Sequence, residues 1–130
     1  MMKIHESAEN YLETILMLSK KNQVVRSIDI ANELGFSKPS VSIAMKKLRE
    51  NGYVKMDGNG YITLAKPGLD IATKIYERHV LITKVLEDIG VDPQIAADDA
   101  CRVEHVISNE TFDRIKEYVK ENEADSAENE

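Results

Sequence analysis

The 130-residue sequence is poor in the features that mark secreted and membrane proteins. It holds one cysteine, which excludes an intrachain disulfide framework. It has no signal-peptide core and no apolar run near the roughly 20 residues that a membrane-spanning helix needs. It also lacks an internal repeat, a phosphate-binding glycine loop and a serine-nucleophile motif. These absences predict a cytoplasmic protein that is not an enzyme and has neither a membrane partner nor a small-molecule substrate.

Charge is distributed unevenly along the chain, although the net charge is -6. Residues 1–19 carry one basic and three acidic residues, residues 20–66 carry nine and four, and residues 67–130 carry seven and sixteen. A basic block inside an acidic chain is typical of a protein in which one module meets DNA phosphates and another has a different role. With 42% hydrophobic residues, the chain can form two small coupled domains.

Residues 26–53 have the pattern of a helix-turn-helix, after an amphipathic helix over Met2–Lys21. Ser27 is predicted to cap a short helix, and Gly35 to end it in the left-handed conformation. Ser37 is predicted to cap the second helix, whose outward side is polar and basic, as in helices that enter the major groove. A helical hairpin with a solvated basic face would have a similar sequence.

A predicted β-hairpin follows this motif directly. Tyr53–Met56 and Tyr61–Leu64 are short strand-like runs around the turn Asp57–Gly60. A helix-turn-helix followed by a hairpin is a winged-helix domain, which favours DNA binding. The candidate DNA-binding residues are Arg26, Ser37, Lys38, Pro39, Ser40, Ser42, Lys46, Lys47 and Lys55.

The second half of the chain is predicted to be helical. One long helix runs from Lys66 or Pro67 to about Ile89 and ends at Gly90. Two shorter helices follow, over Gln94 to about Val106 with an Asp92 cap, and over Asn109 to about Glu121 with a Ser108 cap. The fold class is therefore mainly α with a small β-hairpin. The predicted domains are 1–65, a winged-helix DNA-binding domain, and 66–121, a helical domain, before a disordered acidic tail at 122–130.

Potential metal ligands gather in the second of these three helices. Cys101, Glu104 and His105 are spaced i, i+3 and i+4, so in a helix a thiol, a carboxylate and an imidazole share one face. Such a donor set suits a divalent cation. Alternatively, Cys101 is a small buried hydrophobe and the other two residues are solvated. A metal-independent winged-helix regulator with a redox-sensing Cys101 and a zinc hydrolase are the competing functions.

The winged helix, the pair Arg78–His79 and the run Ala100–Val106 together resemble the diphtheria-toxin-repressor family of iron- or manganese-dependent transcriptional regulators. The likeness extends from about Glu6 to Val119. It implies a homodimeric repressor that binds a palindromic DNA operator when loaded with metal and controls metal-homeostasis genes. It makes 66–121 a metal-binding and dimerisation domain, in the short form that lacks the SH3-like domain of longer members.

The resemblance also implies a set of ligands and several departures. By position the ligands are Asn10, Glu13, His79, Cys101, Glu104 and His105. Asn10 replaces the methionine of the iron branch and the aspartate of the manganese branch. The second, ancillary metal site of the iron branch would include His79, but its other helix ligands fall on Thr83 and Ala97, which are not metal-binding side chains. In the predicted DNA-binding helix, Ile43 stands where a polar residue is usual.

The metal prediction depends on which donor dominates. A thiolate from Cys101 favours Fe(II) over Mn(II), whereas the carboxylate of Glu13 matches the manganese branch and suits both ions. Fe(II) is therefore the predicted cofactor and Mn(II) the alternative. Co(II), Ni(II) or Zn(II) can substitute in vitro by the Irving–Williams order.

Overall fold

The computed structural model describes residues 6–128, with side chains to residue 123. The described residues form six helices and one antiparallel hairpin, so the prediction of a mainly helical fold is confirmed. The start of the first helix at Met2 lies outside these residues. The chain divides into two compact units, Met1–Lys74 and Ile75–Glu130. The elements are α1 (Glu6–Lys21), α2 (Ser27–Leu34), α3 (Lys38–Glu50), β1 (Val54–Met56), β2 (Ile62–Leu64), α4 (Lys66–Asp88), α5 (Pro93–Val103) and α6 (Asn109–Glu128).

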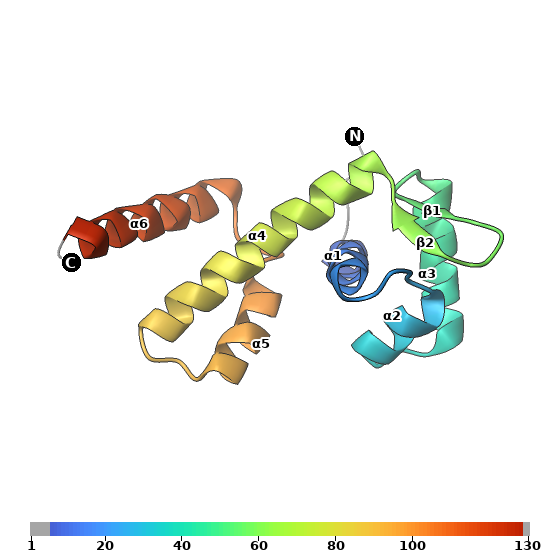
Figure 1. Ribbon diagram of the computed structural model, residues 1–130, viewed down its shortest axis with the longest axis horizontal. Coiled ribbons are helices and arrows are strands. Elements are labelled where there is room, and N and C mark those ends of the chain that lie inside the picture. Colours follow the sequence, from blue (N-terminus) through green and yellow to red (C-terminus); the bar gives the residue numbers. More distant parts are fainter. Residues whose placement is uncertain (1–5, 129–130) are drawn as a thin grey trace. The chain divides into compact units, whose positions relative to one another are not determined.

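Figure 1 labels the helices and strands of the first unit, α1, α2, α3, β1, β2 and the start of α4. Every one of these elements contributes to one apolar core. Val41, Met45 and Leu48 form the inner face of α3 and are all buried. Leu12 and Ile15 of α1 are buried in the same cluster. This packing fixes which side of α3 is left to solvent.

The helix-turn-helix forms largely where the sequence predicts it. Gly35 has a φ of 70° in the turn after α2, a left-handed conformation that glycine adopts without a steric penalty. The predicted Ser27 cap is wrong. Arg26 is the N-cap residue, and its backbone N–H donates to the Asp29 carboxylate at 2.9 Å. An acidic residue at the third helical position can therefore satisfy the end of α2 without the serine hydroxyl.

The hairpin forms the predicted wing, with each strand one residue shorter than expected. Lys55 pairs with Thr63, and both are exposed, whereas Val54 and Ile62 on the opposite face are buried. The Asp57 carboxylate accepts the backbone N–H groups of Asn59 and Tyr61 in the turn, each at 2.9 Å. Alternation along the strands thus leaves a lysine on the solvent side of the wing.

The first turns of α4 belong to the first unit, although the helix continues into the second. Gly68 is buried, and a Cβ placed on it would lie 2.1 Å from the Tyr53 carbonyl oxygen. Only glycine allows this close approach. Ala72, one turn further on, is part of the first core. The units consequently divide after Lys74, inside α4. The domain boundary after residue 65 stays a prediction.

The second unit contains the remainder of α4 with α5 and α6. Asp92 caps α5 as predicted, accepting the backbone N–H groups of Gln94 and Ile95. The prediction that the last helix ends near Glu121 is wrong, because α6 continues to Glu128. Glutamate and alanine are strong helix formers, and Glu123 pairs with Lys84. Both effects extend the helix into residues that were predicted to be a disordered tail.

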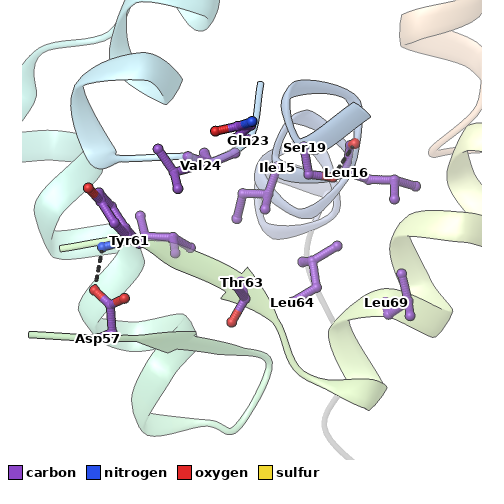
Figure 2. Close-up of a pocket in the computed structure, with 12 residues that line it drawn as sticks. Ile15, Leu16, Ser19, Gln23, Val24, Asp57, Tyr61, Thr63, Leu64 and Leu69 are labelled. Carbon is purple, nitrogen blue, oxygen red and sulfur yellow. Dashed lines mark hydrogen bonds between the residues drawn. The ribbon is translucent and has the colours of Figure 1, made fainter. Parts of the chain in front are cut away.

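A half-open pocket of about 390 Å³ lies in the first unit between α1, the segment after it and the hairpin (Figure 2). Its lining is mainly apolar, including Ile15, Leu16 and Leu64. Asp57 is the acidic residue among those lining it, and that carboxylate is already engaged by the wing turn. The pocket thus offers no cluster of catalytic groups.

No helix in the described part of the chain is long and apolar enough to span a membrane.

Candidate DNA-binding face and metal centre

The outward side of α3 carries mainly polar and basic residues, with Ile43 exposed among them. Ser37 caps the helix, accepting the Ser40 backbone N–H at 3.3 Å and donating its hydroxyl to Ser40 Oγ at 2.8 Å. Pro39 occupies the first turn, where its missing N–H costs no helical hydrogen bond. The predicted α3 residues are all exposed, namely Ser37, Lys38, Pro39, Ser40, Ser42, Lys46 and Lys47. We call this surface the α3 face.

Two further basic residues of the same unit are exposed beside the wing and at the start of α2. Arg26 lies with its guanidinium carbon 4.8 Å from the centre of the Tyr61 ring and donates a hydrogen bond to the Tyr61 hydroxyl at 3.1 Å. Lys55 projects from β1 on its exposed face. Because Tyr61 orients the Arg26 side chain, this charge is held close to the hairpin.

The second unit holds a buried carboxylate against an imidazole. Glu104 is completely buried, and its Oε2 lies 2.9 Å from Nδ1 of His79 on α4. The hydrogen bond to Glu104 raises the pKa of His79 above its ordinary value, although partial burial opposes the shift. The pair offers an oxygen and a nitrogen ligand close enough to bind one cation. His79 and Glu104, 25 residues apart in sequence, are thus brought together by the fold.

The end of α5 differs from the prediction. The helix ends at Val103, not near Val106, and Glu104 occupies its C-cap position while its N–H still donates to the Ala100 carbonyl at 2.9 Å. The chain turns here, so the side chains of Glu104 and His105 are almost fully buried and Cys101 is exposed. His105 Nε2 lies 3.3 Å from Glu104 Oε1. The structure therefore groups both histidines around Glu104, and a metal-binding role for Cys101 stays a prediction.

Arg78, next to His79, anchors the segment that carries Glu104. Its guanidinium is buried and donates to the carbonyls of Glu104 at 3.0 Å and Ile107 at 2.9 Å, and to the Asn109 side chain at 2.6 Å. It also lies 5.4 Å from the centre of the Phe112 ring. Sequence reasoning assigned this arginine no role. Its sequence signal was its place in the apolar stripe of α4, where Ile75, Arg78 and Ile82 are spaced i, i+3 and i+7. An arginine at such a position is expected to be buried.

Asn10 and Glu13 lie one turn apart on α1, in the first unit. Glu13 is buried, with 3% of its surface exposed, and Asn10 is half-buried. The Asn10 backbone carbonyl accepts a hydrogen bond from the Thr14 hydroxyl at 2.8 Å, and the Asn10 side chain takes no part in that bond. Their assignment as ligands stays a prediction, since it came from the family resemblance.

Two family descriptions match the chain almost from end to end. Iron dependent repressor, N-terminal DNA binding domain, matches residues 3–62. Iron dependent repressor, metal binding and dimerisation domain, matches residues 66–130. The chain belongs to the iron-dependent repressor family. The predicted diphtheria-toxin-repressor likeness is thereby confirmed, and the protein is a metal-dependent transcriptional repressor and not an enzyme.

Individual members of the iron-dependent repressor family agree with this assignment. An uncharacterised HTH-type transcriptional regulator, MJ0568 of Methanocaldococcus jannaschii, is 33% identical over 117 residues, or 88% of this chain and 94% of that protein. The regulator MntR of Bacillus subtilis is 32% identical over 121 residues, or 93% of this chain and 85% of MntR. A manganese-dependent transcriptional repressor in complex with manganese is 27% identical with a TM-score of 0.80, covering 87% of this chain and 52% of that one.

Proposed function

We propose that the chain is an Fe(II)-responsive homodimeric repressor that acts on a palindromic operator in the cytoplasm and controls metal-homeostasis genes. The observation that carries this proposal is the buried Glu104 carboxylate held against His79 within the metal-binding domain. A buried carboxylate is costly unless it is paired or bound to a metal. Mn(II) is the alternative ion, because a solved relative is described as manganese-dependent.

The proposed ligand set combines hard and soft donors. Glu104, His79 and His105 supply an oxygen and two nitrogens that are close together in the second unit. Cys101, Asn10 and Glu13 are proposed to complete the set. A bound divalent cation would supply positive charge to the buried Glu104 carboxylate.

The affinity for metal is expected to depend on pH. The hydrogen bond to Glu104 favours the protonated form of His79, and a metal that binds at His79 Nδ1 must displace that proton, so the metal affinity is expected to fall as the pH falls.

Metal binding is proposed to act on DNA affinity through the placement of the two units. Asn10 and Glu13 belong to the DNA-binding unit, and the other ligands belong to the dimerisation unit. Coordination by both groups would favour one arrangement of the α3 faces in the dimer over others. A coupling of about 1 to 3 kcal/mol, typical of allosteric proteins, changes DNA affinity by roughly 5- to 150-fold.

Dimerisation through the second unit is consistent with its surface. Several large apolar residues are exposed there, namely Val80, Ile89, Ile95, Val103, Val106 and Tyr118. Apolar residues of this size in a small unit favour a partner surface. A two-fold dimer presents two α3 faces related by symmetry, which is why a palindromic operator is proposed.

The preference for Fe(II) can be tested by comparing ions under anaerobic conditions. Fe(II) is expected to activate operator binding at a lower free concentration than Mn(II), because a thiolate ligand suits the softer ion. The variant Cys101→Glu is expected to narrow or reverse that order. Fluorescence anisotropy of a labelled operator, with buffered free metal, measures the concentration at half-maximal binding. A wild-type chain that responds to Mn(II) at least as well as to Fe(II) would exclude the iron assignment and leave the manganese alternative.

Two lysines of the α3 face provide a test of the DNA contact. Lys46→Ala and Lys47→Ala are expected to weaken DNA binding to a similar extent on all sequences, because lysines mainly contact phosphates. The slope of log affinity against log salt should fall by about one unit for each contact removed. Lys120→Ala, an exposed lysine of the second unit, is the matched control and should leave the slope unchanged. Unchanged slopes for both α3 variants would show that this face does not meet DNA.

A further inference from the structure

A large apolar side chain lies at the centre of the α3 face. Ile43 is 60% exposed, and it does not pack against the core of the first unit. An α-helix turns about 100° per residue, and Ile43 lies two residues from each of the buried Val41 and Met45. Its side chain therefore points about 160° away from theirs. It therefore projects from the side of α3 that is opposite the core.

The residues around Ile43 are those of a DNA-reading surface. One turn before it lie Pro39 and Ser40, and one turn after it lie Lys46 and Lys47, all of them exposed. The two lysines bring positive charge that is complementary to the phosphate backbone. An isoleucine surrounded by these groups would be among the first side chains to reach the base edges when α3 enters the major groove.

We propose that Ile43 is a specificity-determining residue that contacts the 5-methyl group of a thymine in the operator. In the major groove this methyl is the apolar group among otherwise polar base edges. Isoleucine forms no hydrogen bond, so a cytosine amino group or a guanine oxygen facing it would lose water without gaining a partner. Ile43 thus selects an A·T pair at one position of each half-site. The inference rests on the DNA-binding domain and is independent of which metal activates the protein.

The test removes one methyl group at a time from the DNA. An operator is first selected from random-sequence duplexes by the ion-loaded full chain. Each thymine of that operator is then replaced in turn by deoxyuridine, which differs from thymidine only in lacking the 5-methyl group. For wild type, one position in each half-site should show about a fourfold loss of affinity, and about 15-fold when both half-sites are changed, as expected for burial of one methyl group. All other replacements should have little effect.

The variant Ile43→Ala should bind the thymine operator more weakly and show no difference between thymine and deoxyuridine at that position. Ile43 is exposed, so this variant should keep its circular dichroism spectrum. Lys47→Ala is the matched control, since it should weaken binding yet keep the full methyl effect. The inference is overturned if no thymine in the half-site is sensitive, if Ile43→Ala keeps the methyl effect, or if the Lys47→Ala control loses it.

Discussion

Replacing Glu104 with glutamine is expected to raise the Fe(II) concentration needed for operator binding by at least about 100-fold, since changes to groups that merely support metal ligands already cost 10- to 100-fold. Glutamine has almost the same volume as glutamate, so it fills the buried space while removing the negative charge and one strong oxygen donor. The hydrogen bond to His79 would no longer be to a charged group. The substitution is therefore expected to weaken metal binding with little effect on packing.

The control for this substitution is Glu87→Gln, which changes an exposed carboxylate on α4. Operator binding as a function of free metal should be unchanged in that variant. Circular dichroism and the dimer mass should match wild type for both proteins. If Glu104→Gln responds to metal like wild type, Glu104 is not a ligand and the proposed centre is wrong.

Replacing Arg78 with methionine is expected to lower the free energy of unfolding by about 3 to 5 kcal/mol. The substitution removes three hydrogen bonds made by a buried charged group and leaves the carbonyls of Glu104 and Ile107 without that donor. Methionine matches the length of the aliphatic stem, so loss of packing is kept small. Urea unfolding followed by circular dichroism, at one fixed protein concentration because of dimerisation, measures the change.

The exposed Arg114 of α6 is the matched control for Arg78. It pairs with Glu117 at 3.3 Å on the helix surface, where an ion pair contributes little. Arg114→Met should change the free energy of unfolding by no more than about 0.5 kcal/mol. Equal effects of the two substitutions would mean that the buried contacts of Arg78 do not stabilise the second unit.

The features that sequence analysis predicted well depend on local chemistry. The left-handed Gly35, the Ser37 cap and the Asp57–Gly60 turn each fix the backbone over a few residues, so α3 and the hairpin form where expected. Helix ends were less accurate where several groups compete to satisfy them. Arg26 and not Ser27 is the N-cap residue of α2, where the Asp29 carboxylate accepts the Arg26 backbone N–H. Helix-forming residues extend α6 past Glu121.

The candidate metal centre could be predicted only in part, because its geometry comes from distant residues. The spacing of Glu104 and His105 identified them as a candidate pair, but their burial depends on the chain turning at the end of α5. The contact between His79 and Glu104 joins α4 to that turn. Arg78 holds the turn through backbone carbonyls, which carry no sequence signal. The prediction for Cys101 was made for a longer helix than the structure has.

The most direct measurement of the central claim is a single operator-binding titration that starts from metal-free protein. The metal-free chain should bind operator and random DNA with similar weak affinity. Anaerobic addition of Fe(II) should raise operator affinity by roughly 5- to 150-fold, and a chelator should return it to the starting value. Operator affinity that is unchanged by both metal and chelator, and that responds instead to peroxide, would contradict metal activation and favour oxidation of Cys101 as the switch.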